Sequence, residues 1–472
     1  MSTNNNVKAL KSGIWYTAAN FIMKGIGFIT IPIFTRLLTH DEFGLYSNYA
    51  SWLHTFTMFA SLNLGVTFIS ARFDFENDFD GYISSVLSLS TFSILIWLLI
   101  VNLFPTFFTT ITGVEFKHLN IMMLYLLFAA AIDIFQTRER YYFNYKISVF
   151  ISLFLSVSSS VLAVLLIMYM DNKLDGRILG FAIPYILMGM ILYIIIFKRG
   201  KKINFSYWKY ALPICLPFIP HLLSLTLLNS MDKIMITRFC GPAQNALYSL
   251  AYSCGAVITI LISSLNTAFS PWLGEKLHAN NFSEIKNVST KYVLLFVGLT
   301  CGIMLIVPEL LLIMGGVSYQ EAIYVMPPIA FGCVCQFIYT MHVNIEQYKK
   351  KTVGMAIASI SAAGLNYLLN MVFIPKYGYI AAAYTTLTSF LWLMLIHMFL
   401  VYRIGYAGVY DRNKILQIVF CVGLYTVLIH WLYGNMVLRY IAIAVYSCVF
   451  IHVALIYKNT LLELFVKKKT RI

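Results

Sequence analysis

The chain has few charged residues, and this scarcity excludes an ordinary soluble protein. Aspartate, glutamate, lysine and arginine make up 11% of its 472 residues, whereas hydrophobic residues make up 60%. Soluble domains carry roughly a quarter charged residues. An apolar run of about 20 residues can cross a bilayer as a helix, and the sequence supplies many such runs. The composition therefore predicts an all-α protein that crosses a membrane many times.

Several signatures of catalytic and disulfide-bonded proteins are also missing. The sequence has no G-x-x-x-x-G-K-[ST] phosphate loop and no His/Glu pair at metal-ligand spacing on a helix. The eight cysteines show no disulfide framework, so we expect them to pack as small apolar residues. The longest predicted outer connection runs only from about Pro105 to Lys117, too short for the external domain of a glycan polymerase. These absences predict a transporter, not an enzyme, with no metal and no cofactor.

The apolar runs predict about fourteen membrane-spanning helices. They cover residues 12–35, 44–70, 83–104, 118–136, 147–170, 177–197, 211–238, 243–270, 290–314, 322–343, 353–375, 379–402, 414–433 and 437–457. With the N-terminus placed in the cytoplasm, most lysines and arginines fall in cytoplasmic connections, as the positive-inside rule predicts. Both termini are then cytoplasmic. The net charge of +15 thus indicates topology and not nucleic-acid binding.

Two segments of the sequence repeat at a constant offset of 202 residues. The first copy contains Thr35-Arg36 and Leu45-Tyr46-Ser47, and the second contains Thr237-Arg238 and Leu247-Tyr248-Ser249. Such a repeat in a membrane chain is typical of two-lobed transporters, with the substrate path between parallel lobes. We expect an N-lobe at 1–205 with helices 1 to 6, a C-lobe at 206–405 with helices 7 to 12, and a final segment at 406–472 with helices 13 and 14 and a basic tail.

Charges inside predicted helices mark the candidate substrate path, because each costs about 2.5 kcal/mol or more in hydrocarbon. Lys24 lies near the middle of the first predicted helix, and Tyr16 and Asn20 share its face at four-residue spacing. We interpret this face as a cationic, hydrogen-bonding stripe toward a central cavity. The alternative is that Lys24 snorkels to the interface or pairs with a structural carboxylate.

The seventh predicted helix carries polar residues at the matching place of the second lobe. His221, Asn229 and Asp232 fall within one quadrant of this helix. Three prolines interrupt the backbone hydrogen bonds of its first half, which membrane helices tolerate where they line a cavity. We expect His221 and Asn229 to line the cavity, although a lone membrane histidine is often a packing residue. Asp232 is a candidate to bind a coupling proton or cation, or to pair with Lys24 or Arg238.

Four further charged residues have candidate roles at helix ends. Arg72 is a candidate to collect an anionic headgroup at the cytoplasmic face, and Asp133 a candidate for a gating ion pair with the arginines that follow it. Arg36 and Arg238 occupy equivalent places in the repeat. That equivalence favours a role in the frame, or in contact with lipid headgroups, over substrate binding.

The eleventh and twelfth predicted helices resemble a known family. The stretch LNYLLNMVFIPKYGYIAAAYTT at 365–386 is similar to the "N-x-x-L-N…I-P…G-x-x-G-A-A…T" segment of Wzx-type polysaccharide flippases, in the multidrug/oligosaccharidyl-lipid/polysaccharide (MOP) superfamily. The prolines and Asp232 of the seventh helix, and Phe43-Gly44-Leu45-Tyr46 after the first, resemble the same family. One departure is Ala381-Ala382, where the family often has a glycine.

This resemblance implies a fold and a function. The expected fold has two six-helix lobes around a central cavity, with two C-terminal helices appended. The expected function is translocation, by alternating access, of undecaprenyl-diphosphate-linked oligosaccharide repeat units across the bacterial cytoplasmic (inner) membrane. The units would serve O-antigen of lipopolysaccharide, capsule or exopolysaccharide biosynthesis. A H+ or Na+ gradient or the membrane potential is the expected driving force.

The expected partners are the lipid-linked oligosaccharide and membrane lipids, together with a polysaccharide polymerase and a chain-length regulator. Three alternatives remain open. They are a MATE-like cation-coupled multidrug exporter, a peptidoglycan-precursor flippase and a membrane glycan polymerase. The lysine in the first helix argues against the exporter, because cavities for cationic drugs tend to be acidic.

Overall fold

The computed structural model describes residues 3–142, 144–349 and 351–456, and every regular element in these ranges is helical. Among them, 10 helices are long and apolar enough to cross a membrane, and Met436–His452 is a shorter apolar helix. The all-α, multi-pass class is therefore confirmed, while the number of fourteen helices stays a prediction. The chain divides into two compact units, which are described one at a time. The lobe boundaries at 205 and 405 also stay predictions.

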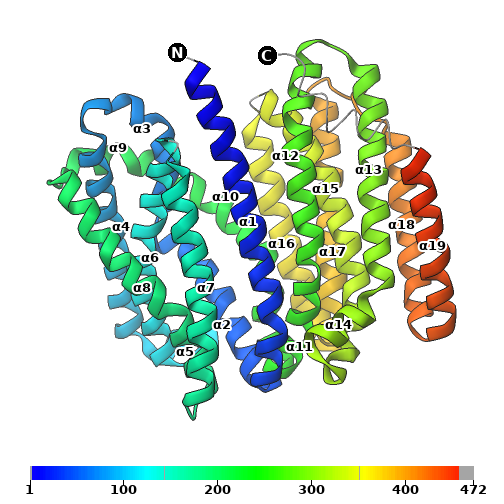
Figure 1. Cartoon of the computed structure of the whole chain (residues 1–472), viewed down its shortest axis with the longest axis horizontal. Helices are drawn as coiled ribbons and strands as arrows, with labels where there is room; N and C mark the ends of the chain where they lie inside the picture. The colour runs from blue at the N-terminus through cyan, green and yellow to red at the C-terminus, as the bar shows by residue number, and fades with distance from the viewer. Residues whose placement is uncertain (1–2, 143, 350, 457–472) are drawn as a thin grey trace. The chain divides into compact units, whose positions relative to one another are not determined.

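Unit 1 comprises the residues up to Leu250 together with Ala356–Thr385. Its elements are α1 (Thr3–Leu37), α2 (His40–Ala60), η1 (Leu64–Thr67), α3 (Phe68–Asp74), η2 (Glu76–Asp78), α4 (Phe79–Leu103), α5 (Pro105–Thr112), α6 (Phe116–Tyr141), α7 (Tyr145–Tyr169), α8 (Lys173–Gly200), α9 (Phe205–Cys215), α10 (Phe218–Cys240), most of α11 (Pro242–Cys254) and of α16 (Thr352–Tyr377), and the start of α17 (Tyr379–Arg403). Helix α1 runs beside α7 (Figure 1), where Phe34 packs against Ala163 and Ile167.

The second predicted span, 44–70, is wrong as a single helix. A capping box of Thr39 and Glu42 starts α2, because each residue bonds the other's backbone N–H. The helix then ends at Ala60, before Leu62 and Asn63, whose φ angles are 60° and 43°. Two successive left-handed residues cannot continue a right-handed helix. The short helices η1 and α3 follow instead.

The predicted spans 211–238 and 243–270 are also divided. Helix α9 ends at Cys215 and α10 begins at Phe218, so the break falls among the prolines that the sequence analysis singled out. Helices α11 and α12 (Ala256–His278) are separated at Gly255. The connection from Pro105 to Lys117, expected to be a loop, contains the eight-residue helix α5.

Unit 2 comprises Ala251–Met355 and Thr386–Ile472, described as far as residue 456. Its elements are α12, α13 (Phe282–Leu305), α14 (Val307–Gly315), η3 (Val317–Val325), α15 (Met326–Tyr348), the remainder of α17, α18 (Arg412–Tyr433) and α19 (Met436–Ile456). Figure 1 shows α13, α18 and α19 side by side. Arg439 at the start of α19 forms a two-point ion pair with Glu309 of α14, with N–O distances of 2.5 and 2.9 Å. This pair ties α19 to the helices beside it.

Large apolar side chains cover outer faces of the helices, as expected for a protein that contacts lipid. Along α7 the exposed residues recur every three or four positions, so they form one stripe. They are Phe150, Phe154, Val157, Val161, Leu165 and Met168. A stripe of this kind facing water would be an association surface, whereas in a bilayer it is the ordinary lipid-facing surface. All eight cysteines are free, but Cys421 and Cys448 are exposed and not packed as expected.

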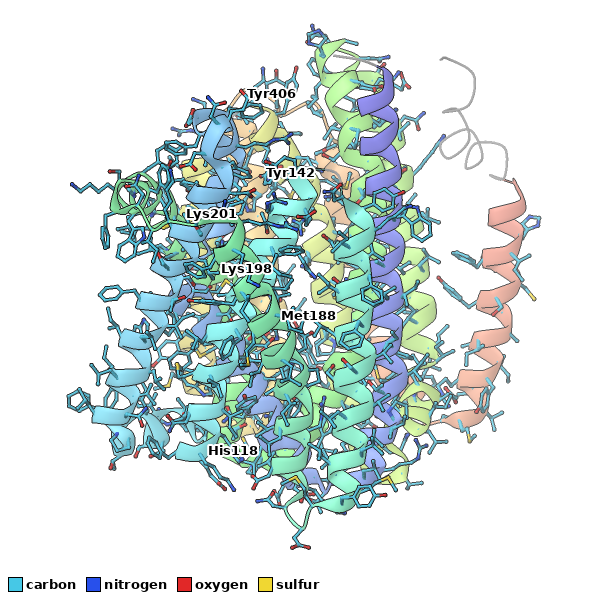
Figure 2. All side chains as sticks on the ribbon, turned by 60° about the vertical axis from the view of Figure 1, so that its left-hand side comes forward. His118, Tyr142, Met188, Lys198, Lys201 and Tyr406 are labelled. Carbon is cyan, nitrogen blue, oxygen red and sulfur yellow. The ribbon has the colours of Figure 1, made fainter. Side chains whose placement is uncertain are left out.

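The acidic run after α3 is anchored at one end of unit 1. Asp74 accepts a hydrogen bond from Tyr210, Asp78 accepts one from Tyr207, and both distances are 2.5 Å. Burial, with a further contribution from Asp78, raises the pKa of Tyr207 to about 12, so its hydroxyl remains a donor at neutral pH. Figure 2 shows Lys198, Lys201 and Tyr142 toward this end and His118 toward the opposite end. The segment from the end of α3 to the start of α4 is therefore held against α9.

The two copies of the sequence repeat meet in unit 1. The hydroxyl oxygens of Ser47 in α2 and Ser249 in α11 are 2.6 Å apart, and these two serines are themselves 202 residues apart. Beside them, the Asn245 side chain donates to the carbonyl oxygen of Gly44 at 2.9 Å. An added Cβ at Gly44 would lie only 1.8 Å from the carbonyl oxygen of Pro242. The repeated segments thus form a direct contact in which one backbone lies against the other.

Replacing Gly44 with valine should therefore destabilise the protein. The new side chain has to displace backbone and not a flexible side chain, so we expect a loss of about 3 kcal/mol and a clearly lower Tm in detergent. Gly27→Ala is the matched control, because an ideal Cβ at Gly27 meets nothing within 4 Å. Equal Tm values for the two variants would contradict the close approach of α2 and α11.

Candidate functional site

Equivalent tyrosines of the two repeats contact opposite charges. Tyr248 in α11 donates a hydrogen bond from its hydroxyl to the Asp232 carboxylate at 2.6 Å. Tyr46, its counterpart in α2, has its ring centroid 4.0 Å from the guanidinium carbon of Arg177, which also lies 3.9 Å from the Phe34 ring. Stacking between two rings stabilises a guanidinium without a carboxylate. The equivalent tyrosine therefore contacts an acidic side chain in one copy of the repeat and a basic side chain in the other.

Asp232 is the centre of a buried polar network that joins four helices. Its side chain belongs to α10 and is 1% exposed. Besides the Tyr248 hydroxyl, it accepts a bond from the Asn370 side chain of α16 at 2.7 Å. Asn370 also donates to Asn366 at 3.1 Å and accepts from Thr385 of α17. We name Asp232, Tyr248, Asn366, Asn370 and Thr385 the Asp232 network.

The chemistry of this network suits a small hard cation or a proton. Its acceptor atoms are all oxygens, from a carboxylate, two amides and two hydroxyls, and Thr385 in turn bonds the carbonyl oxygen of Ala382 at 2.9 Å. Oxygen donors are the ligands that hard cations prefer. No group of three or more His, Cys, Asp or Glu side chains able to hold a metal ion occurs among the described residues.

A cavity of about 300 Å³ lies within the helices of unit 1. Its walls come from the end of α2, the turn that follows it, and α4, α6 and α8; they include Ser61, Asn63, Asp133, Gln136 and Tyr185. The left-handed turn at 62–63 thus borders a cavity, as irregular backbone in a membrane protein usually does. Asp133 is exposed to this space.

The ion pair proposed for Asp133 does not involve Arg138. Arg138 instead contacts Asp80 through two N–O distances of 2.7 and 3.0 Å, and it also contacts Glu139. Arg140 is the arginine that interacts electrostatically with Asp133. Asp133 lines the cavity within unit 1, and its gating role stays a prediction.

Arg72 closes the end of α6. Its guanidinium donates to the carbonyl oxygen of Tyr141 and lies over the ring of Tyr142 at 5.3 Å. Unpaired carbonyls at the end of a helix are satisfied by such donors. The structure thus gives Arg72 a local capping contact, and its expected role toward a lipid-linked headgroup stays a prediction.

The other predicted site residues are placed as follows. Lys24 is exposed on α1, and no described side chain lies within hydrogen-bonding distance of its ammonium group. Asn229 is exposed on α10. The side chains of Tyr16, Asn20 and His221 lie outside the described residues. The stripe of Tyr16, Asn20 and Lys24 therefore keeps its status as a prediction.

The two repeated arginines fit local roles at helix ends. Arg36 donates to the carbonyl oxygen of Pro32 in its own last turn at 2.9 Å, and Arg238 is exposed in the last turn of α10. The threonines before them also match, because Thr35 bonds the carbonyl of Ile31 and Thr237 that of Lys233, four residues back in each case. The threonine contacts match between the two copies, and the frame role expected for the arginines stays a prediction.

Sequence reasoning missed two parts of this arrangement. Local sequence patterns do not single out Arg177, although its partner Tyr46 belongs to the repeat. Asn366, Asn370 and Thr385 were noted only as part of a family-like stretch, without a link to Asp232. The usable signal was that the polar residues of this stretch recur at positions 366 and 370, on one helix face.

Comparison with known families gives the chain its place. A family model described as "Polysaccharide biosynthesis protein" matches residues 9–277, more than half of the chain. The chain belongs to this family. A second family model, MatE, matches residues 217–372. Comparison with curated protein sequences finds no match.

Solved structures share the fold. A structure of the lipid II flippase MurJ in an inward closed conformation superposes on this chain with a TM-score of 0.73 at 15% identity. The superposition covers 95% of this chain and 100% of the MurJ chain. An outward-facing multidrug resistance MATE family transporter of the MOP superfamily gives a TM-score of 0.55 at 12% identity, over 85% and 96%. Its inward-facing form gives 0.54 at 14%, over 82% and 94%. At these identities the likeness establishes the fold.

The family and the fold confirm the main expectations from the sequence. The protein is a multi-pass membrane protein with the fold of the MOP superfamily. The family models and the flippase structure that match the chain belong to transporters, which confirms that the protein is not an enzyme.

The unequal chemistry of the two repeated tyrosines can be tested by matched substitutions. Tyr248→Phe removes the hydroxyl that donates to buried Asp232, so we expect a loss of about 1–3 kcal/mol in stability and a lower Tm. Tyr46→Phe removes a hydroxyl that also interacts with Arg177, but it keeps the aromatic ring over the guanidinium and should cost less. The reverse order of the two Tm values would show that the Tyr248–Asp232 bond contributes little.

Proposed function

We propose that this protein translocates undecaprenyl-diphosphate-linked oligosaccharide repeat units from the cytoplasmic to the outer leaflet. The observation that carries the proposal is membership of the polysaccharide biosynthesis protein family over residues 9–277. The MurJ-like fold supports it, because MurJ is a flippase of lipid II. The products would enter O-antigen, capsule or exopolysaccharide biosynthesis in the bacterial inner membrane.

The physics of the substrate requires a protein path. A diphosphate and a glycan cannot leave water to cross about 30 Å of hydrocarbon, whereas the polyprenyl tail can stay in lipid. A path for the headgroup must therefore supply cations and hydrogen-bond donors. Lys24 is a candidate for this role, because it is an exposed cation on α1 with no described acidic partner. Rocking of two lobes would expose the path to each side in turn.

We further propose that the Asp232 network couples transport to a cation gradient. Its buried carboxylate is surrounded by hydroxyl and amide groups from α11, α16 and α17, so binding a proton or a sodium ion would neutralise it. Neutralisation would change the hydrogen bonds that join these helices to α10. A gradient can drive transport if the cation binds one conformation more tightly than the other.

One alternative has support of its own. The MatE model matches residues 217–372, and MATE transporters share the fold, so export of cationic drugs is the second candidate. The two functions differ in the sign of the substrate charge. A deletion strain that accumulates lipid-linked repeat units on its inner leaflet supports the flippase, whereas unchanged glycan display with new drug sensitivity supports the exporter.

The expected setting follows from the proposal. Both termini would be cytoplasmic, in keeping with the concentration of basic residues in the connections assigned to that side. The polysaccharide polymerase and the chain-length regulator would receive the unit at the outer face, so we expect them as partners. No cofactor is required beyond the driving ion or the membrane potential.

Replacing Lys24 with alanine should abolish surface glycan while leaving the amount of protein in the membrane unchanged. The reason is loss of a cation that offsets the diphosphate charge, and Lys24→Arg should restore most of the glycan. Lys146→Ala, at an exposed lysine of α7, is the control. Normal glycan display by the Lys24→Ala strain would remove this residue from the substrate path.

Replacing Asp232 with asparagine should uncouple transport from the gradient. In vesicles loaded with a labelled lipid-linked oligosaccharide, an imposed proton or sodium gradient should accelerate transfer by the wild type but not by Asp232→Asn. Asp171→Asn changes an exposed carboxylate after α7 and should behave like the wild type. Transfer that ignores both Asp232→Asn and collapse of the two gradients would refute the coupling role.

A further inference from the structure

Unit 2 contains a buried pair of ionisable side chains that the proposed function does not use. Glu346 belongs to the last turns of α15 and His397 to α17, and they are 1% and 2% exposed. One Glu346 oxygen, Oε1, lies 2.7 Å from Nδ1 of His397. A carboxylate and an imidazole so placed in a membrane protein share a proton or carry opposite charges. Burial of both partners makes the pair costly unless it has a specific role.

The environment of the second Glu346 oxygen favours a neutral carboxylic acid. Oε2 is buried and has no hydrogen-bond partner. An ionised carboxylate with one oxygen wholly unsatisfied is strongly disfavoured in the protein interior. In a carboxylic acid, by contrast, the proton on Oε1 can be donated to His397, and Oε2 becomes a neutral carbonyl oxygen that tolerates isolation better. The geometry therefore fits a pair that holds one proton and has no net charge.

A second histidine lies one helical turn from Glu346 and lines a cavity. His342 lies one turn before Glu346 on α15, and its Nδ1 is 2.8 Å from the carbonyl oxygen of Ile338. Because a carbonyl only accepts, Nδ1 carries the hydrogen, and Nε2 of the neutral ring is left as a base. His342 lines a cavity of about 190 Å³ that is also bordered by Tyr406, Tyr410 and Arg412. This volume has room for several water molecules.

Asp411, between the cavity-lining Tyr410 and Arg412, has its carboxylate 3.5 Å from Lys286 and 3.8 Å from Lys414. The Tyr339 ring stacks on His397 at 5.5 Å, and Tyr410 packs edge-on against His342 at 4.9 Å. Helices α12 and α13 contact α15 through uncharged side chains, Asn266 to Asn344 and Phe296 to Phe337.

The cations near the cavity have other positions. Arg412 borders the cavity at the start of α18. The ammonium of Lys349, one turn beyond Glu346, lies over the Tyr406 ring at 4.6 Å. A hydrogen bond from Lys349 to Tyr406 raises the pKa of this lysine, so it stays charged and held by Tyr406 at neutral pH. Among the described residues, His397 is therefore the titratable side chain in contact with Glu346.

We propose that Glu346 and His397 form a proton-binding site of unit 2, loaded from the cavity through His342. In the empty state the pair is a carboxylate beside a neutral imidazole and carries one negative charge. A proton from cavity water binds His342 at Nε2, passes to the pair, and leaves a carboxylic acid bonded to imidazole, with no net charge. Release reverses these transfers. The site is separate from the Asp232 network and does not depend on which substrate is carried.

The experiment measures the proton on Glu346 directly. Full-length protein in lipid nanodiscs, labelled with carbon-13 at the glutamate side-chain carboxyl, is examined by infrared difference spectroscopy between pH 5 and 9. The wild type should show a labelled carboxylic-acid carbonyl band that disappears as pH rises. Glu346→Gln should lose this band, and Glu321→Gln, at an exposed residue of the same unit, should keep it. The label separates this band from those of Asp232 and Asp133.

Two histidine variants test the partner and the route. His397→Asn should shift the midpoint of the band by at least one pH unit, because the partner of the acid is lost. His342→Gln should leave the midpoint in place but slow the band's response to a pH jump by about tenfold or more. Retention of the band in Glu346→Gln, or a labelled band in the wild type that does not change with pH, would overturn the proposal. An unaltered rate in His342→Gln would overturn the route.

A purely structural clamp gives a different pattern. Glu346 and His397 would then join α15 to α17 in one fixed protonation state at all pH values tested. A labelled band that changes with pH in the wild type and shifts in His397→Asn excludes the clamp, so the result stands even if Glu346→Gln fails to fold. Because the readout involves no substrate, it stays informative whether or not the lipid-linked oligosaccharide proves to be the cargo.

Discussion

The contact between α2 and α11 is the constraint on which the rest of unit 1 depends. Gly44 leaves the space that the Pro242 carbonyl occupies, and the Ser47 and Ser249 hydroxyls then meet at 2.6 Å. With the two backbones so close, Tyr46 and Tyr248 are carried on helices whose separation cannot vary much. Close packing makes such a contact rigid, since interiors respond to small displacements with large energetic costs. The charged partners of the two tyrosines are therefore placed by the repeat itself.

Within the two repeats, the uncharged residues make matching contacts, whereas the charged residues differ. Thr35 and Thr237 make matching backbone bonds, and the paired serines contact each other directly. Charge is where the copies differ, because Asp232 stands in one copy and Arg177 beside the other. A site for a cation and a site for an anion need opposite signs, so a transporter that uses both has to break its own symmetry there.

Features set by neighbouring residues could be predicted from the sequence, whereas contacts between residues far apart along the chain could not. The repeat and the prolines before α10 are visible as local patterns, and the cost of charge in a membrane makes Asp232 a candidate site residue. The link from Asp232 to Asn370 spans 138 residues, and nothing local determines which two of many membrane helices touch. Glu346 was missed because the predicted helix stopped at 343, whereas α15 continues to Tyr348 and buries the carboxylate. Helix ends are the least certain part of such predictions.

The pairing of Ser47 with Ser249 has a consequence for how such a chain can arise. If the two repeats were separate, identical polypeptides, the same serine would meet its own copy across a two-fold axis, the self-complementary geometry of a symmetric homodimer. A surface of that kind can form before any duplication joins the halves. Fusion then frees each half to change alone, and the single-chain form can acquire Asp232 on one side without forcing an aspartate onto the other.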